Sequence, residues 1–351
     1  MKKKNFSLSN KSLSKTEIIT IGGATRDIMF YTDKGRIIDT SENPTCQKLL
    51  GFELSAKIDI QQPYYTIGGG ACNAAVNFSK LGFKASAVIR VGDDKEGKEI
   101  IKNFKKYKIN ASFAQVDKKI ATGFSFLVIG EKNKEYVAFL YRGANDNLQL
   151  TTHNLQLINN SQQFKTKCVY VSSLSGENWE NILNNVVKIK KFNSNIKFVW
   201  NPGISQLKAG YSKLKDFLKA ADLLVLNQDE AIELVYSSGE KIKDIERLLK
   251  IIKSWGVKIA VITKGAEGAS AYDGEKIEHQ PAYPTKVVDT TGAGDAFGST
   301  LAAGLILYND LGKALKLAAV NSASVLTEIG AHNGLLDLKE LNKKYLTLLS
   351  S

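Results

Sequence analysis

Short apolar runs alternate with amphipathic segments through the second half of the chain. The apolar runs predict buried strands, at residues 168–172, 196–200, 223–226 and 257–263. The segments between them repeat apolar residues at helical spacing and predict helices, at residues 179–191, 205–220 and 242–254. Strands that alternate with helices in this way are typical of a parallel sheet covered on both faces. The pattern therefore predicts a three-layer α/β/α domain with a mostly parallel central sheet.

The first half of the chain combines this pattern with a second one. Residues 17–21 and 85–91 predict two more strands, and residues 71–81 and 95–107 predict two helices. Residues 30–66 and 112–141 instead alternate polar and apolar positions, with strands expected at 112–116, 121–129 and 135–141 and a hairpin turn at 131–134. We expect these two segments to form a small β-sheet that acts as a lid over the site.

The two ends of the chain differ in character. Residues 1–16 are rich in Lys, Ser and Asn and have no apolar segment, which predicts a disordered basic tail. Residues 17–351 are expected to form one domain, ending in small-residue and amphipathic helices at 296–308, 311–327 and 337–351. No signal-like segment and no apolar stretch of membrane-spanning length is found, so we expect a cytoplasmic protein without a membrane partner.

The charge and the cysteine content exclude several classes of function. The net charge of +13 raises the question of nucleic-acid binding. The lysines are spread along the chain rather than gathered with aromatic residues, so we expect no nucleic-acid partner. The 3 cysteines and 3 histidines are dispersed, which indicates neither a disulfide framework nor a zinc site.

The strongest chemical signal is a glycine turn that opens a helix near the C-terminal end. Gly292, Ala293 and Gly294 are followed at once by Asp295. A glycine turn at a helix N-terminus exposes unpaired N–H groups and suits an anion such as phosphate. A carboxylate beside a bound phosphate would be repelled unless it has a task, and the obvious task is to take a proton from an attacking hydroxyl. The alternative is that Asp295 simply caps the helix.

Two nucleotide-binding motifs can be rejected upstream. Residues 68–73 begin with three glycines, but Asn73 stands where a dinucleotide-binding motif needs its last glycine. Residues 92–98 have the spacing of a Walker A loop, but Glu99 replaces the Ser or Thr that would bind magnesium.

The glycine turn near the C-terminal end and the upstream glycine-rich stretch resemble the two signatures of the PfkB (ribokinase-like) carbohydrate kinases. Residues 288–297 read Val-Asp-Thr-Thr-Gly-Ala-Gly-Asp-Ala-Phe, and residues 68–97 resemble the first signature of that family. The resemblance runs from about Ile18 to Leu336, nearly the whole chain. It implies a ribokinase-like fold and transfer of the γ-phosphate of ATP to a hydroxyl of a sugar or sugar-like substrate, with magnesium.

The resemblance also implies roles for particular residues. Asp295 would be the general base, and the N–H groups of residues 292–294 would form the anion hole. The substrate would be bound by Asp27, Gly69, Gly70, Asn73 and Arg142. The nucleotide would be bound by Asn227, Thr263, Gly265 and Asn321. Asn321, Gly330 and Ala331 lie where the family cradles adenine and closes a monovalent-cation loop.

Two cation sites follow from the same resemblance. Asn227 and Glu230 match the family's Asn-x-x-Glu step and would hold magnesium through water, although this spacing alone is equally a helix capping box. Asp289 and Thr291 would form a site for a monovalent cation such as potassium. Three points stay open: whether the acceptor is a sugar or a nucleoside, whether the chain is an inactive sugar- or nucleotide-binding relative, and whether it forms a homodimer through the lid.

Overall fold

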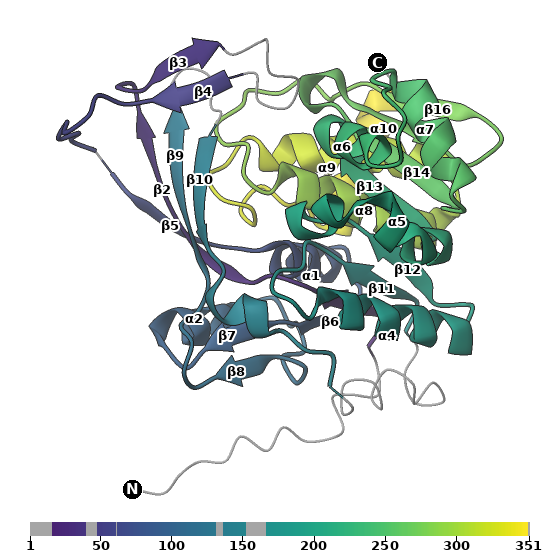
Figure 1. Cartoon of the computed structure of the whole chain (residues 1–351), viewed down its shortest axis with the longest axis horizontal. Helices are drawn as coiled ribbons and strands as arrows, with labels where there is room; N and C mark the ends of the chain where they lie inside the picture. Colours follow the sequence, from purple (N-terminus) through teal and green to yellow (C-terminus); the bar gives the residue numbers. More distant parts are fainter. Residues whose placement is uncertain (1–15, 40–47, 61, 131–135, 152–165, 350–351) are drawn as a thin grey trace, which may run out of the picture.

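An eight-stranded sheet forms the centre of the molecule, and its order is β16-β15-β14-β13-β12-β11-β1-β6. The computed structural model describes residues 16–39, 48–60, 62–130, 136–151 and 166–349 (Figure 1). Six strands are parallel, namely β6 (Ala85–Val88), β1 (Ile18–Ile21), β11 (Cys168–Val171), β12 (Lys197–Trp200), β13 (Leu223–Asn227) and β14 (Ile259–Thr263). β15 (Ala269–Tyr272) and β16 (Ile277–Gln280) add an antiparallel edge. The mostly parallel sheet predicted from the apolar runs is confirmed.

Helices cover both faces of this sheet. One face carries α4 (Trp179–Phe192), α5 (Ile204–Ala220), α6 (Gln228–Tyr236) and α7 (Ile245–Ser254). The other carries α1 (Gly70–Lys80), α8 (Ala293–Tyr308), α9 (Leu311–Val325) and α10 (Leu338–Leu349). α2 (Lys95–Lys106) packs beside α1, and Asp94 caps it by accepting a hydrogen bond from the Gly97 N–H. The predicted three-layer α/β/α fold is thus confirmed.

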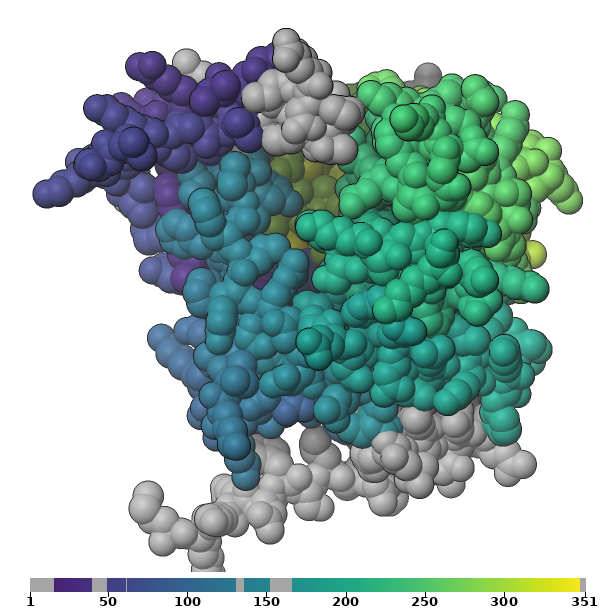
Figure 2. Space-filling model, viewed as in Figure 1, coloured from purple at the N-terminus to yellow at the C-terminus, as the bar shows by residue number. Residues whose placement is uncertain are grey.

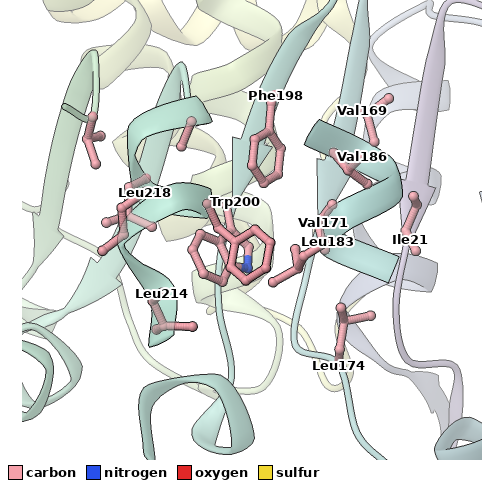
Figure 3. Close-up of a cluster of buried hydrophobic side chains, with 14 of the residues drawn as sticks. Ile21, Val169, Val171, Leu174, Leu183, Val186, Phe198, Trp200, Leu214 and Leu218 are labelled. Carbon is pink, nitrogen blue, oxygen red and sulfur yellow. The ribbon is translucent and has the colours of Figure 1, made fainter. Parts of the chain in front are cut away.

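The strand β12 shows how the sequence supplies both layers. Phe198 and Trp200 lie on the face covered by α4 and α5, whereas Val199 between them belongs to the opposite cluster. Figure 3 shows the first two beside Leu183 of α4 and Leu214 of α5. Successive residues of a strand point to opposite faces, so the apolar run at residues 198–200, which follows the exposed Lys197, is what a strand buried on both faces requires.

A separate four-stranded sheet stands beside the α/β block, at the left of Figure 1. Its order is β10 (Tyr136–Tyr141), β9 (Phe124–Gly130), β2 (Thr25–Thr32) and β5 (Tyr64–Gly68). A short hairpin of β3 (Arg36–Asp39) and β4 (Lys48–Gly51) follows β2. The sheet therefore begins at Thr25, earlier than the residue 30 expected from the sequence.

One predicted strand of that sheet is wrong. Residues 112–116 do not join it; instead β8 (Gln115–Asp117) pairs in parallel with β7 (Arg90–Gly92). The connection through α2 brings β8 back beside β7, a long-range pairing that a short alternating run cannot reveal. The predicted hairpin turn at 131–134 and residues 1–15 of the predicted tail lie outside the described residues. In the part of the chain that the structure describes, no helix is both long and apolar enough to cross a membrane.

Candidate active site

The glycine turn and the first turn of α8 meet the expectation for an anion site. Gly292 is the N-cap with φ 80°, and a Cβ built there would lie 2.3 Å from the Cβ of Ala331, so only glycine fits. A Cβ on Gly294 would meet nothing within 4 Å, which leaves the turn open on that side. Among the described residues, the N–H groups of Gly294 and Asp295 have no hydrogen-bond partner. Unpaired N–H groups at the start of a long helix attract a phosphate oxygen.

Asp295 lies in this first turn but does not cap the helix. The cap residue is Gly292, which has no side-chain capping bond, so the alternative reading of Asp295 as an N-cap is wrong. Its Oδ2 accepts a hydrogen bond of 2.7 Å from the Asn73 side chain. Its Oδ1 faces Gly70, where a built Cβ would be 3.2 Å away. Burial raises the pKa of Asp295, and the Asn73 hydrogen bond works in the opposite direction.

Asp27 lies on β2 of the four-stranded sheet. Its side chain is 5% exposed and accepts a hydrogen bond of 2.9 Å from Thr25 Oγ1. Burial raises the pKa of Asp27 to about 6, and the negative charges of Asp295 and Asp289 act in the same direction. The structure therefore brings three carboxylates from distant parts of the sequence close enough to influence one another.

Two glycines allow the start of α1 to lie close against the ends of β1 and β11 in the central sheet. Gly69 has φ 92°, and a Cβ there would be 2.5 Å from the carbonyl oxygen of Gly23. A Cβ on Gly70 would be 2.7 Å from Ser172 Cβ. Both positions need the absence of a side chain, because β1, β11 and α1 converge there.

Asn227, Glu230, Thr263 and Gly265 gather at the carboxyl edge of the central sheet. Asn227 ends β13 and pairs in register with Thr263, the last residue of β14, and Gly265 follows directly. Asn227 and Glu230 form a capping box: Asn227 Oδ1 accepts from the Glu230 N–H, and Glu230 Oε2 accepts from the Asn227 N–H, both at 2.8 Å. Ligands of doubly wound sheets bind at this edge.

The Asn227–Glu230 pair fits magnesium bound through water. One carboxylate oxygen of Glu230 takes no part in the capping box. Burial raises the pKa of Glu230, and the charges of Glu233, Asp229 and Asp295 raise it further, so a cation there would relieve repulsion. In the described residues no three His, Cys, Asp or Glu side chains form a metal cluster. A single carboxylate with waters and phosphates is what Mg²⁺ commonly uses.

Asp289 and Thr291 are held in a tight turn. Asp289 Oδ1 accepts from the Thr291 N–H and hydroxyl, at 3.0 and 2.8 Å, and Oδ2 accepts from the Gly330 N–H at 2.8 Å. The turn fixes the loop before Gly292 against the loop after α9. Both carboxylate oxygens already have protein donors, so a monovalent cation would have to share them with these donors.

Comparison with known proteins identifies the family. The model of the pfkB family of carbohydrate kinases matches residues 38–338. The chain belongs to this family. A pfkB carbohydrate kinase uses ATP, so membership sets the class of reaction, while the substrate and the roles of individual residues are matters for proposal.

Curated pfkB relatives include several kinds of sugar kinase. An ATP-dependent 6-phosphofructokinase of Thermoanaerobacterium thermosaccharolyticum is 26% identical over 82% of this chain and 86% of its own length. A ribokinase of Dictyostelium discoideum is 26% identical over 90% of this chain and 94% of its own.

Solved structures show the same fold. Arabidopsis thaliana ribokinase complexed with ribose and ATP has a TM-score of 0.75 at 20% identity, covering 94% of this chain and 99% of that one. Burkholderia thailandensis nucleoside kinase complexed with inosine also has a TM-score of 0.75, at 16% identity, covering 95% of this chain and 99% of that one.

One nucleotide-binding residue expected from the pfkB resemblance lies in a buried polar network. Asn321 is 0% exposed. Its amide nitrogen donates to Asn77 Oδ1 and Thr300 Oγ1, and its Oδ1 accepts from the Leu336 N–H. Both N–H bonds are used inside the protein, so the side chain fastens α9 to α1 and α8 and has no donor left for a nucleotide.

The structure shows which groups surround two of the residues expected to bind the substrate, Asn73 and Arg142. Asn73 is buried and turns its amide toward Asp295 and His332. Arg142 is half-buried and forms no ion pair with the residues that the structure describes. Its carbonyl oxygen accepts from Asn145 Nδ2, which also binds the carbonyl of Ala24. Arg142 is thus held close to the start of β2, the strand that carries Asp27.

The sequence reasoning missed three side chains at this site. Tyr136 is 46% exposed, yet partial burial raises its pKa and the charges of Asp295, Asp289 and Asp27 raise it further, which indicates that it lies near the carboxylates. The Tyr31 hydroxyl donates to the carbonyl of Val288, at 3.3 Å. His332 contacts Asn73. Strand alternation could have placed Tyr31 on the face of Asp27, since both are on β2 and an even number of residues apart.

Proposed function

We propose that the chain transfers the γ-phosphate of ATP to a hydroxyl of a neutral sugar, with Asp295 as the general base. The observation that carries the proposal is the place of the Asp295 carboxylate. It stands in the first turn of α8, beside unpaired N–H groups, with Oδ1 facing the glycine turn of α1. A base and an anion site side by side are what phosphoryl transfer to a hydroxyl needs.

In the proposed mechanism, the sugar hydroxyl gives its proton to Asp295 Oδ1 as its oxygen attacks the γ-phosphorus of ATP. The new oxygen–phosphorus bond forms while the bond from the γ-phosphorus to the bridging oxygen breaks, and ADP leaves. The N–H groups of Gly294 and Asp295 stabilise the charge on the transferring phosphoryl group, whereas the Ala293 N–H already donates to the Thr290 carbonyl at 3.4 Å. The raised pKa of Asp295 makes it a better base than an exposed aspartate.

The remaining residues bind and orient. Asp27 accepts hydrogen bonds from other hydroxyls of the sugar, and Arg142 contacts the sugar from the start of the same sheet. Asn227, Thr263 and Gly265 line the nucleotide cleft. Bound through water by Glu230 and Asn227, magnesium would neutralise charge on the ATP phosphates. Potassium, if required, would be held by the loop that Asp289 and Thr291 form.

The charge of the site favours a neutral acceptor. Beyond the effect of burial, the charges of Asp295 and Asp289 raise the pKa of Asp27, and the charges of all three carboxylates raise the pKa of Tyr136. A sugar phosphate or sugar acid bound there would meet these carboxylates at close range, with Arg142 as the one cation of the expected substrate residues. Neutral hydroxyls, by contrast, supply donors that carboxylates accept.

The four-stranded sheet is proposed to act as the lid. It carries Asp27 on the side toward the site, and Figure 2 shows a hollow between this sheet and the α/β block. Closure over bound substrate would exclude water and so limit hydrolysis of ATP.

The outer face of the same sheet is proposed to bind a second copy of the chain. Phe139 pairs in register with Phe126, and Tyr141 with Phe124, so the four rings share one face. All four are exposed, Phe139 by 61%. A contiguous aromatic patch next to the edge strand β10 is a common feature of subunit contacts.

The test is ADP release with magnesium-ATP and potassium on a panel of acceptors. Ribose and fructose are the neutral sugars, fructose 6-phosphate and 2-keto-3-deoxygluconate the anionic ones, and adenosine and inosine the nucleosides. Turnover on a neutral sugar, lost in Asp295→Asn, supports the proposal. Turnover on a nucleoside alone would replace it with the nucleoside alternative, and turnover on an anionic sugar alone would contradict the charge argument. ATP binding without turnover on any acceptor would favour an inactive relative.

A further inference from the structure

A chain of hydrogen bonds leads from Asp295 into the C-terminal loop. Asn73 Nδ2 is 2.7 Å from Asp295 Oδ2. Asn73 Oδ1 is 2.9 Å from His332 Nε2, and His332 Nδ1 is 3.5 Å from Asn103 Nδ2. Asn73 is 6% exposed and His332 8%, so neither can exchange these partners freely for water.

The chemistry of these groups fixes which atom donates at each step. An ionised carboxylate only accepts, so the NH₂ end of the Asn73 amide must face Asp295. The carbonyl end then faces His332, and His332 Nε2 must carry a hydrogen and donate it. His332 Nδ1 is left as an acceptor for the amide of Asn103. The arrangement therefore requires a neutral His332 in the Nε2–H tautomer.

The surroundings of His332 suit that neutral form. Burial, with a smaller contribution from the charges of Lys106 and Lys80, lowers the pKa of His332 to about 4. A proton on Nδ1 would also point at the Asn103 N–H group, so that two hydrogen-bond donors would face each other. The ring of Tyr107 packs edge-on against the imidazole at a centroid distance of 6.0 Å and restricts its rotation.

We propose that His332 is a positioning residue for catalysis: through the Asn73 amide it fixes the rotamer of the Asp295 carboxylate. With His332 in place, the Asn73 amide cannot turn over without setting its carbonyl against Asp295. Oδ2 of Asp295 stays occupied, and Oδ1 stays directed at Gly70 and the acceptor hydroxyl. The inference rests on the proposed role of Asp295 as the base.

A positioning role for His332 differs from a packing role because it depends on the hydrogen bond that His332 Nε2 donates to the Asn73 carbonyl. Replacement of His332 by leucine keeps much of the volume but leaves the Asn73 carbonyl without its donor. Glutamine, whose amide also donates, can restore it. Displacement of a catalytic group by a fraction of an ångström to about 1 Å costs on the order of 10- to 100-fold in rate.

The experiment compares steady-state kinetics of His332→Leu, His332→Gln and the matched control His279→Leu, which changes a histidine on β16. The expected result is a fall in kcat of roughly 10- to 100-fold for His332→Leu with KM for ATP and sugar within about 3-fold. His332→Gln should recover most of this loss. Equal losses for leucine and glutamine, an unchanged kcat in His332→Leu, or an effect on KM alone would overturn the proposal.

Two further measurements separate this inference from the proposed function. In an Asp295→Asn background, His332→Leu should lower kcat no further, because the carboxylate it positions is gone. If Asp295→Asn itself keeps wild-type turnover, the proposed function fails. If Asp295→Asn is inactive but His332→Leu is fully active, only the positioning role fails.

A measurement on the unmodified protein covers the case in which His332→Leu does not fold. Long-range ¹H–¹⁵N NMR of the imidazole rings reports the tautomer of each of the 3 histidines, with His332→Gln giving the assignment. The Nε2–H tautomer at pH 7 is expected for His332. An Nδ1–H tautomer or an imidazolium at that pH would overturn the hydrogen-bond arrangement and the proposal with it.

Discussion

The Asn73 amide donates a hydrogen bond to Asp295 across 222 residues of sequence. Asn73 lies in the first turn of α1 and Asp295 in the first turn of α8, so the bond joins the N-terminal ends of two helices on one face of the sheet. The first glycine-rich stretch thus orients the carboxylate that the second one carries. The two stretches therefore form one site, in which the first supplies an amide donor and the second supplies the carboxylate.

The Asp27 carboxylate should lower the free energy of unfolding at neutral pH, and Asp27→Asn should raise it. An unfolded aspartate has a pKa near 3.8, and burial raises that of folded Asp27 to about 6. Between these values the folded state keeps a proton that the unfolded state has lost, so this group's contribution falls as the pH rises from about 4 to about 6. The shift corresponds to about 3 kcal/mol at most.

The measurement is urea unfolding of wild type and Asp27→Asn at pH 4 and pH 8. The variant should be the more stable at pH 8, with the difference shrinking at pH 4, while its KM for sugar rises. A difference that grows toward pH 4 would show that the carboxylate is stabilised rather than strained in the folded protein.

Gly292→Ala should destabilise the protein, whereas Gly294→Ala should not. Alanine at φ 80° costs about 1–2 kcal/mol, and its Cβ would also press on Ala331. A Cβ at Gly294 meets nothing within 4 Å, which makes it the matched control for stability. Thermal melting should show a lower Tm for the first variant only, and equal losses would refute the role assigned to the left-handed turn.

Asn321→Leu should cost stability without changing ATP binding. The change leaves Asn77 Oδ1 and the Leu336 N–H without the partner that Asn321 supplies, at a cost of about 1–3 kcal/mol, while Thr300 Oγ1 keeps its bond from Asn77 Nδ2. Unfolding free energy and KM for ATP are the two readouts, and Asn227→Ala, in the proposed nucleotide cleft, is the comparison. A raised KM for ATP in Asn321→Leu at unchanged stability would return this residue to the nucleotide site.

Phe139→Lys should dissociate the proposed dimer. A charge at the most exposed ring of the outer face cannot be buried against a second copy without a large desolvation cost. Sedimentation velocity should show a dimer for wild type and a monomer for the variant. A wild-type monomer at micromolar concentration would end this proposal, and Phe192→Lys, which changes an exposed ring on α4, controls for the added charge.

The sequence predicted the α/β framework well because its strands are buried on both faces. A run such as residues 223–226 is apolar throughout and fully buried, as a strand at the centre of a sheet requires. The strand at 112–116 was misplaced because its partner is chosen by the long-range path through α2, which local alternation does not encode.

The site residues also divide into those whose place follows from the local sequence and those whose place depends on the fold. The place of Gly292 and Asp295 at the start of α8 could be predicted, because a glycine turn, an acid and a helix are adjacent in sequence. The buried hydrogen-bond network of Asn321 could not be predicted, because an amide that binds ligand and an amide buried in a polar network look alike in sequence. His332 was missed because its partner Asn73 is 259 residues away, and only the fold brings the two together.

The most direct test of the central claim is single-turnover phosphoryl transfer by Asp295→Asn. The variant keeps the size of the side chain and loses the group that takes the proton. With saturating magnesium-ATP and an accepted sugar, the account predicts a rate lower by about 10²- to 10⁴-fold with ATP binding retained. A rate near that of wild type would contradict the role of Asp295 as the general base.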